Sequence, residues 1–200
     1  MKYSRRNFMK AAGIGAVAVT GNVGTAVAGP APANVPTAIS KETGAFNVNG
    51  KVYQAEYETR TTLWEVIAVK LGMTGTNRSC NRASCGCCSV LIDGVSFYSC
   101  HTLAMEAVGK KILTVEGLGD ERNLHPLQKV AHIYNAAECG FCTPGWEVTA
   151  KGLLDKNPNP NVNDVKAALA GHLCRCGAYD SIVQTVIDTG KVLRGEAEIV

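Results

Sequence analysis

The order of apolar and polar residues divides the chain into a strand-rich part and a helical part. Between residues 42 and 116, short runs alternate apolar with polar residues, which is typical of half-buried strands. The run over residues 46–57 is interrupted by Asn49-Gly50, a dipeptide that favours a two-residue hairpin turn. Residues 90–99, interrupted by Asp93-Gly94, predict a second hairpin of the same kind.

A helix and a final strand complete this first part. Thr62 and Glu65 have the spacing of a capping box, and Gly72 suits the left-handed residue that ends a helix. One face of this helix is apolar and consists of Leu63, Val66, Ile67 and Leu71. Residues 112–116 predict the last strand of the sheet.

Residues 124–200 predict four short amphipathic helices that pack as a bundle. Pro126 suits the first turn of the first helix, Thr143 is expected to cap the second, and Asn161 is expected to cap the third. The positions predicted to face inward are Leu127, Val130, Ala131, Tyr134, Trp146, Ala150, Leu153, Leu154, Val162, Val165, Leu169, Tyr179, Ile182, Val183, Val186 and Ile187. The polar, glycine-containing residues 117–123 are expected to form a hinge between the two parts.

The N-terminal segment has the features of an export signal. Ser4-Arg5-Arg6-Asn7-Phe8-Met9-Lys10 resembles the twin-arginine motif, and a mildly apolar stretch follows up to Ala26-Val27-Ala28, where small residues suit cleavage. We therefore predict a signal peptide over residues 1–28, a proline-containing linker over residues 29–41, and delivery to the periplasm by the twin-arginine export machinery. The alternative is an uncleaved membrane anchor, although the glycines of this segment disfavour a spanning helix.

The charge balance gives no indication of a nucleic-acid partner. The chain has 20 Lys and Arg residues against 17 Asp and Glu residues. Four of the basic residues lie in the predicted signal peptide, so the rest of the chain has 16 basic and 17 acidic residues and contains no basic run. We expect no nucleic-acid partner.

Four of the nine cysteines form a group in the helical part. Cys139 and Cys142 have C-x2-C spacing, and Cys174 and Cys176 follow as C-x-C. Two such pairs at helix ends can bring four thiolates to one inorganic centre. The residues alone leave zinc and an iron–sulfur cluster open for this group, with disulfides disfavoured.

The loop before the second hairpin contains a more specific pattern. Cys80, Cys85 and Cys88 have C-x4-C-x2-C spacing, and Cys100 follows as a distant fourth thiolate. This is the spacing of plant-type [2Fe–2S] ferredoxins, and the hairpin–helix–loop–hairpin context fits a β-grasp ferredoxin-like domain. Cys87, next to Cys88, is in excess of the four ligands, and we interpret it as a buried packing residue rather than a redox-active thiol.

Together these motifs resemble those of the small iron–sulfur subunit of the xanthine oxidase and aldehyde oxidoreductase family of molybdenum hydroxylases. The resemblance covers residues 42–195 and depends on the C-x4-C-x2-C loop, Glu138-Cys-Gly-Phe-Cys-Thr-Pro-Gly145 and Leu173-Cys-Arg-Cys-Gly-Ala-Tyr179. It implies an α+β chain with an N-terminal β-grasp ferredoxin-like domain at residues 42–116 and a four-helix [2Fe–2S] domain at residues 124–200. It also implies that the helical group binds a second [2Fe–2S] cluster rather than zinc.

The resemblance further implies a function and partners. A large subunit with a molybdopterin cofactor would oxidise an aldehyde or N-heterocycle. Electrons would then pass through the two clusters of this chain to an FAD-binding subunit, a c-type cytochrome (haem c) or another acceptor. Periplasmic aldehyde oxidoreductases have small subunits that look similar. A free-standing periplasmic electron carrier and a redox sensor are the alternatives.

Two details concern the helical group. Glu138 occupies the position at which the family usually has a Gln that touches the pterin, and by resemblance Cys176 lies near the pterin as well. Whether Glu138 makes a related contact or indicates a different one is left open. A Rieske-like role for His172 is disfavoured, because four cysteines complete the ligand set. The other histidines, which also lack metal spacing, are His101, His125 and His132.

Overall fold

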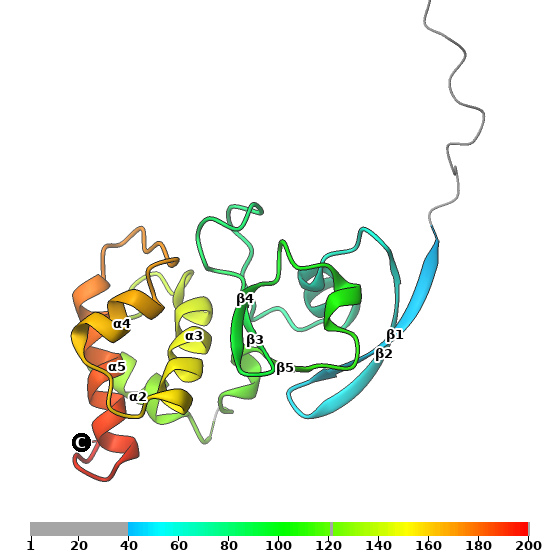
Figure 1. Cartoon of the computed structure of the whole chain (residues 1–200). Coiled ribbons are helices and arrows are strands. Elements are labelled where there is room, and N and C mark those ends of the chain that lie inside the picture. Colours follow the sequence, from blue (N-terminus) through cyan, green and yellow to red (C-terminus); the bar gives the residue numbers. More distant parts are fainter. Residues whose placement is uncertain (1–39, 121, 200) are drawn as a thin grey trace, which may run out of the picture. The chain divides into compact units, whose positions relative to one another are not determined.

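The structure is a computed structural model that describes residues 40–120 and 122–199 (Figure 1). The described residues all belong to one compact unit of the chain. The predicted signal peptide and all but the last two residues of the predicted linker lie outside the described residues.

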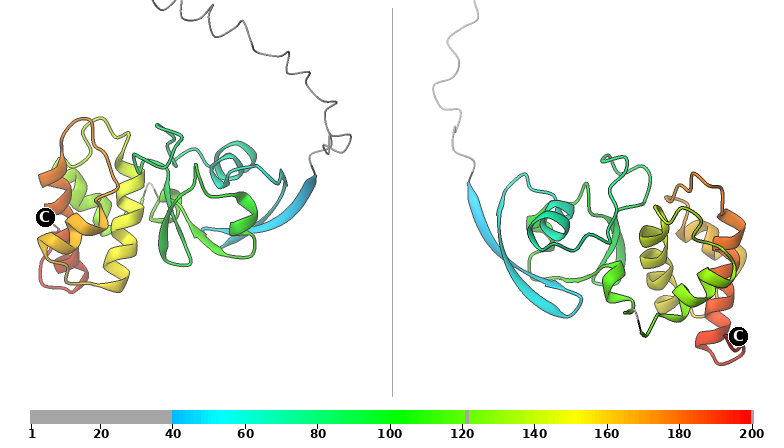
Figure 2. Two further views of the ribbon diagram at one scale, coloured as in Figure 1. Left: turned by 45° about the horizontal axis from the view of Figure 1, so that its top comes forward. Right: turned by 180° about the vertical axis from the view of Figure 1, so that it is seen from behind.

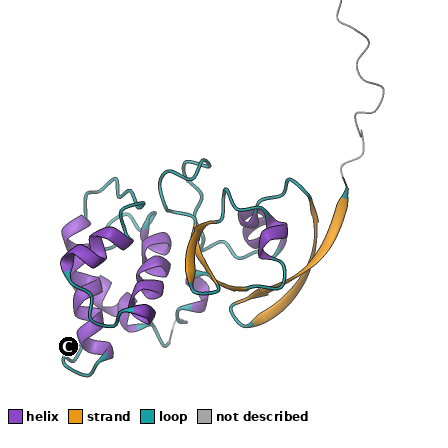
Figure 3. Ribbon diagram, viewed as in Figure 1, coloured by secondary structure: helices purple, strands orange, loops and turns teal. Residues whose placement is uncertain are grey.

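The first part of the unit is built on a mixed five-stranded sheet with the strand order β2-β1-β5-β3-β4 (Figure 3). Its strands are β1 (Lys41–Val48), β2 (Lys51–Glu58), β3 (Ser89–Ile92), β4 (Val95–Tyr98) and β5 (Lys111–Leu113). The pairs β1–β2, β3–β4 and β3–β5 are antiparallel, whereas β1 and β5 run parallel. With the helices that follow it, the sheet makes the chain an α+β protein, as predicted.

Both predicted hairpin turns are confirmed by their backbone angles. Asn49 and Gly50 have φ values of 52° and 79°, and Asp93 and Gly94 have φ values of 49° and 78°. Two successive residues with positive φ define the type I′ turn, whose twist matches that of the flanking strands. Asn, Asp and Gly tolerate this conformation better than other residues, which explains why the two turns could be located from the sequence.

The predicted capping box between the hairpins is confirmed too. The Glu65 carboxylate accepts hydrogen bonds from the backbone N–H and the hydroxyl of Thr62, at 2.8 and 3.0 Å. The helix that follows, Glu65–Lys70, is a π-helix, and it ends before Gly72 with φ of 72°. Its buried residues Val66 and Ile67 pack into the core between the sheet and this helix.

The last strand is shorter than predicted. We expected residues 112–116, but β5 ends at Leu113 and a short 3₁₀-helix, Val115–Gly117, follows. The physical reason is the Asn49 side chain, which accepts a hydrogen bond from the Thr114 N–H and donates one to the Thr114 hydroxyl, both 2.9 Å long. Thr114 therefore bonds to the turn of the first hairpin instead of extending the sheet.

The second part contains the four predicted helices. They are α2 (Pro126–Ile133), α3 (Thr143–Lys156), α4 (Val162–Ala168) and α5 (Tyr179–Leu193). Asn161 caps α4 through hydrogen bonds from the N–H groups of Asn163 and Asp164, as predicted. The cap predicted for α3 is wrong: Cys142 occupies the N-cap position, and Thr143 lies inside the helix with its hydroxyl unpartnered among the described residues.

Three residues predicted to face inward are exposed instead. Tyr134 reaches outward, where its hydroxyl donates to Asp188, and Tyr179 reaches back to accept a hydrogen bond from the Cys174 N–H at 2.9 Å. Val162 is exposed because it is the first residue of a short helix that packs through Val165. A tyrosine whose hydroxyl finds a polar partner does not need to be buried, so the apolar periodicity over-predicts these positions.

The two parts pack together through α3, which lies against β3 and β4 (Figures 1 and 2). The core of the helical part contains Trp146, Leu127 and Val186, and it extends to Cys85 and Cys87 from the loop before β3. A cysteine loop of the first part is therefore packed into the core of the second. Within the described ranges, no helix is long and apolar enough to cross a membrane.

Candidate metal centres

The first group of predicted ligands lies on the loop that leads into β3 and at the end of β4. Cys80, Cys85 and Cys88 come from the loop, and Cys100 lies two residues after the end of β4. Cys80 is partly exposed, whereas the other three are buried. The Cys80 thiol is in hydrogen-bonding contact with Cys85, and the Cys88 thiol with Cys100, so the structure brings the four predicted ligands together in two pairs.

The backbone of this loop turns its N–H groups toward sulfur. Asn81, Ala83 and Gly86 have positive φ, and the Ser84 N–H donates to the Cys80 Sγ at 3.4 Å. This hydrogen bond is the largest of several that lower the pKa of Cys80 to about 7, although burial opposes it. Cys88 lies deeper, and burial raises the pKa of its thiol to about 12. The loop therefore stabilises thiolate character most strongly at the exposed end of the group.

The second group of predicted ligands lies at the N-terminal ends of two helices. Cys139 and Cys142 precede α3, and Cys174 and Cys176 precede α5. The Cys142 thiol contacts Cys174, and the Cys176 thiol contacts Cys139. Cys142 is buried, Cys174 is partly buried, and Cys139 and Cys176 are exposed. One pair therefore lies in the protein interior and the other lies at the surface.

Helix-end N–H groups surround this second group. Burial acts to raise the pKa of Cys174, but hydrogen bonds from the backbone of Ala178 and Gly177 outweigh it and lower that pKa. Gly177 and Gly140 both have positive φ, which tightens the two turns that contain the cysteines. N–H groups directed at sulfur offset the negative charge of thiolates, which is what an anionic inorganic centre requires.

Comparisons with known proteins agree with this geometry. A sequence model of the "[2Fe-2S] binding domain" matches residues 114–187. The nicotine 6-hydroxylase small subunit of Paenarthrobacter nicotinovorans is 40% identical over 70% of this chain and 85% of its own length. The chain belongs to the iron–sulfur subunits of the molybdenum hydroxylase family.

Two further relatives extend the comparison. The aldehyde oxidoreductase of Megalodesulfovibrio gigas is 40% identical over 76% of this chain, but the match spans only 17% of that longer protein. A chain in the crystal structure of quinoline 2-oxidoreductase from Pseudomonas putida 86 is similar in structure, with a TM-score of 0.73 and 37% sequence identity. The match covers 78% of this chain and 99% of that one. This iron–sulfur subunit therefore corresponds to a separate chain in some relatives and to a small portion of a single longer chain in another.

The residues fit the cluster that the family implies. Each group offers four thiols that meet in two pairs, which is the donor set of a [2Fe–2S] cluster. Beside Cys142, the buried Thr143 Oγ1 and Trp146 Nε1 have no hydrogen-bond partner among the described residues. In the part of the chain that the structure describes, no group of three or more His, Cys, Asp or Glu side chains is arranged around a single metal ion.

Cys87 lies between the two groups. It is buried in the core of the helical part with Cys85 and Cys142, and burial raises the pKa of its thiol to about 12. A thiol that is inaccessible and protonated is a poor nucleophile and is slow to oxidise. These surroundings are those of a packing residue.

The two groups are joined by contacts that the sequence did not predict. The Leu173 N–H donates to the Cys85 carbonyl at 3.0 Å. A Cβ on Gly145 would lie 2.2 Å from the Gly86 carbonyl oxygen, and a Cβ on Gly86 would lie 2.6 Å from the His172 ring. Glycines at 86 and 145 therefore permit the close approach of the two loops. Their presence inside the two cysteine motifs is the sequence feature from which this approach could have been predicted.

His172 joins the two parts of the chain at this junction. Its Nε2 lies 3.1 Å from the Ser89 hydroxyl of β3 and 3.2 Å from the Thr149 hydroxyl of α3. Burial lowers the pKa of the ring, which favours the neutral form that can accept a hydrogen bond here. His125 serves a different purpose, since its Nδ1 accepts from the Leu127 N–H and caps α2.

Glu138 is exposed beside the surface pair of the second group. Its carboxylate is close enough to the Cys176 thiol for its charge to act on it. The pterin contacts predicted for Glu138 and Cys176 remain predictions.

Proposed function

We propose that this chain is the electron-transfer subunit of a periplasmic molybdenum hydroxylase. It would receive electrons from a molybdopterin-binding large subunit that oxidises an aldehyde or an N-heterocycle. An FAD-binding subunit, a c-type cytochrome or another acceptor would take them up. The observation that carries this proposal is the junction of the two cysteine groups through Leu173 and Cys85, because electron transfer requires two redox centres that are held close together.

The proposal assigns one cluster to each group. Cys80, Cys85, Cys88 and Cys100 would hold the first [2Fe–2S] cluster, in a β-grasp ferredoxin-like domain over residues 42–116. The second cluster would lie in the helical domain over residues 124–200, held by Cys139, Cys142, Cys174 and Cys176. Each cluster, when bound, accepts and releases one electron at a time. The protein supplies the thiolates, the N–H groups directed at them, and a core that excludes water from the buried pairs.

The surface pair of the helical group indicates where the large subunit would bind. Cys139 and Cys176 are exposed. Two large apolar residues lie within three positions of them in the sequence and are exposed, Phe141 by 47% and Leu173 by 56%. Apolar side chains next to functional ligands are typical of surfaces that a partner covers. We therefore place the molybdopterin cofactor on this side, close to Glu138 and Cys176.

Export is part of the proposal and depends on the N-terminal motif. The twin-arginine machinery transports folded proteins, so clusters inserted in the cytoplasm would reach the periplasm already protected. This would keep the cysteines from forming disulfides in an oxidising compartment.

Purification of the native protein tests the proposal. We expect the chain to co-elute from a periplasmic extract with a larger subunit that contains molybdenum, and substrate to reduce both clusters in that complex. A chain that elutes alone, with both clusters and no molybdenum in any fraction that contains it, would instead support a free-standing electron carrier. A chain whose partners change when the clusters are oxidised would support a redox sensor.

A further inference from the structure

Trp146 contains a buried hydrogen-bond donor that the described residues leave without a partner. The side chain is only 1% exposed and lies in the core of the helical part, and its Nε1 is among the buried polar atoms that lack a partner. A buried N–H without an acceptor destabilises the folded state, because it loses its hydrogen bond to water. Phe would fill most of the same space without this cost. The unpartnered donor therefore indicates an acceptor that becomes available only when a ligand binds nearby.

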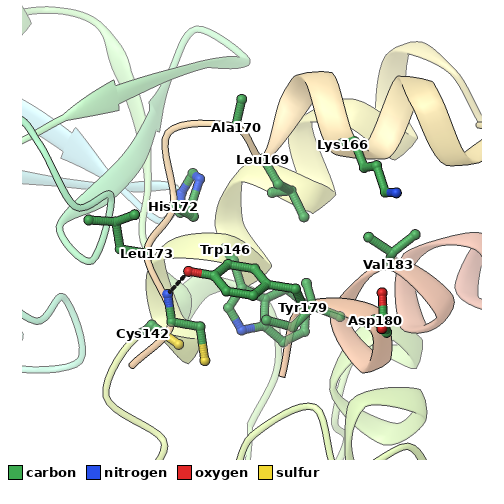
Figure 4. Close-up of a pocket in the computed structure, with 12 residues that line it drawn as sticks. Cys142, Trp146, Lys166, Leu169, Ala170, His172, Leu173, Tyr179, Asp180 and Val183 are labelled. Atoms are coloured by element: carbon green, nitrogen blue, oxygen red, sulfur yellow. Dashed lines mark hydrogen bonds between the residues drawn. The ribbon is translucent and has the colours of Figure 1, made fainter. Parts of the chain in front are cut away.

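The helix places this donor beside the second cysteine group. Trp146 follows Cys142 by four residues, and the backbone N–H of Trp146 donates to the Cys142 carbonyl at 3.3 Å, so the two side chains lie on the same helix face. Long side chains in helices point back toward the N-terminus, which directs the indole toward Cys142. Trp146, Cys142 and Cys174 line one cavity of about 370 Å³, and Figure 4 shows the indole nitrogen on the side of the cavity where the sulfur atoms lie.

The acceptor should be sulfur that carries negative charge. A neutral thiol is a weak acceptor, whereas a thiolate bound to iron is a strong one. The first candidate is the Sγ of Cys142, because Cys142 precedes Trp146 by one helical turn on the same face. A donor at this position stabilises added negative charge, so it favours the reduced state of the cluster over the oxidised state.

We propose that the Nε1–H of Trp146 donates a hydrogen bond to a sulfur atom of the helical-domain cluster, first of all Cys142 Sγ, and raises the reduction potential of that cluster. The inference rests on the proposed function, because it requires the second cluster. It adds a residue that sets the driving force for electron transfer out of the large subunit.

The test is the Trp146→Phe substitution in the intact complex, with Trp64→Phe as the matched control. Trp64 is the other tryptophan of the chain, and its Nε1 already donates to the Thr76 carbonyl at 2.7 Å. In a redox titration followed by EPR, we expect Trp146→Phe to lower the midpoint potential of the helical-domain cluster. Trp64→Phe should leave the potential of that cluster unchanged. An unchanged potential in Trp146→Phe with full iron content would overturn the inference.

A second measurement needs no substitution and therefore does not depend on the variant folding. The wild-type complex is labelled with ¹⁵N-indole tryptophan, and hyperfine couplings to the reduced helical-domain cluster are recorded. We expect a ¹⁵N coupling, and its absence would overturn the inference while leaving the proposed function intact. A protein with zinc in the helical group, and hence a single EPR signal, would overturn both.

Discussion

The backbone N–H of Leu173 lies 3.0 Å from the carbonyl oxygen of Cys85 and donates a hydrogen bond to it. Leu173 is the neighbour of Cys174, so this bond joins a predicted ligand of the first group to the residue beside a predicted ligand of the second. The loops that carry the two groups therefore cannot separate without breaking it. The first prediction concerns the packing that surrounds this contact.

Gly145→Ala should destabilise the protein, since its new Cβ would lie 2.2 Å from the Gly86 carbonyl oxygen. A backbone atom cannot move aside as the end of a side chain can. We therefore expect the free energy of unfolding to fall by about 2 kcal/mol or more, measured through a lower thermal unfolding temperature of the iron-loaded protein. Gly152→Ala is the control on the same helix. Its Cβ would meet the flexible end of Leu91, so we expect a much smaller effect. Equal effects of the two substitutions would show that the loop junction is not tightly packed.

Cys87→Ala should leave both clusters in place. Burial raises the pKa of the Cys87 thiol to about 12, and the eight other cysteines would supply two complete ligand sets. Iron and sulfide analysis should give two [2Fe–2S] clusters per chain in the wild type and in the variant, with two distinct EPR signals after reduction. Loss of one signal in Cys87→Ala would make Cys87 a ligand.

Two serine substitutions should reveal the order of electron transfer. If the exposed helical group faces the large subunit, Cys176→Ser should prevent substrate from reducing the ferredoxin-like cluster. Cys85→Ser should still permit substrate to reduce the helical-domain cluster while the final acceptor stays oxidised. Rapid-freeze EPR of the complex distinguishes these states, and iron content must be measured in each variant because serine can replace a thiolate. The opposite pattern would reverse the proposed order.

Glu138→Gln should raise the reduction potential of the helical-domain cluster. Glu138 is exposed, and in its ionised form it places a negative charge beside Cys176, which disfavours reduction. The substitution removes that charge and keeps the shape of the side chain. A redox titration of the complex at two pH values measures the effect. An unchanged potential combined with the loss of a pH dependence of turnover would show instead that Glu138 is protonated in the complex.

Glu147→Gln should stabilise the protein at alkaline pH. Burial raises the pKa of Glu147 from 4.5 to about 7, partly opposed by a hydrogen bond from Gln128. The folded chain therefore binds this proton more tightly than the unfolded chain. The contribution of protonated Glu147 to the free energy of unfolding is fully present below pH 4.5 and is lost as the pH rises to about 7. At higher pH the ionised carboxylate destabilises the fold by at most about 3 kcal/mol.

The unfolding temperatures of wild type and Glu147→Gln should therefore differ at pH 8 and converge near pH 5. Glu198→Gln provides the control, because it removes a carboxylate that is exposed. A difference between wild type and Glu147→Gln that does not change with pH would mean that Glu147 does not titrate in this range.

Local signals explain which parts of the fold could be predicted from the sequence. The turns at Asn49-Gly50 and Asp93-Gly94, the cap at Asn161 and the capping box at Thr62 each depend on residues that are close in the sequence. The predictions that failed depend on partners distant in the sequence. β5 ends early because Asn49 binds Thr114, and Tyr134 is exposed because its hydroxyl donates to Asp188.

The candidate site divides in the same way. The spacing within each short cysteine motif is a local property, and in the structure the cysteines of each predicted group contact one another in pairs. The junction between the groups depends on Leu173 and Cys85, which are far apart in the chain, and on glycines whose packing role is visible only in three dimensions. Trp146 was predicted as a core residue, and it is one, but apolar periodicity carries no information about the direction of its N–H group.

The strand order has a consequence for how the chain is assembled during synthesis. β5 lies in the middle of the sheet, between β1 and β3, but it is the last strand to be made. A growing chain that has not reached residue 111 therefore contains two separate hairpins, because β5 is the strand that joins them. The four cysteines of the first group all precede β5 and flank the second hairpin, so their loop is complete before the sheet closes. If iron bound before β5 was made, it would meet the predicted ligands of the first group around the β3–β4 hairpin alone. At that stage this hairpin would still be open to solvent, because α3 would not yet cover it.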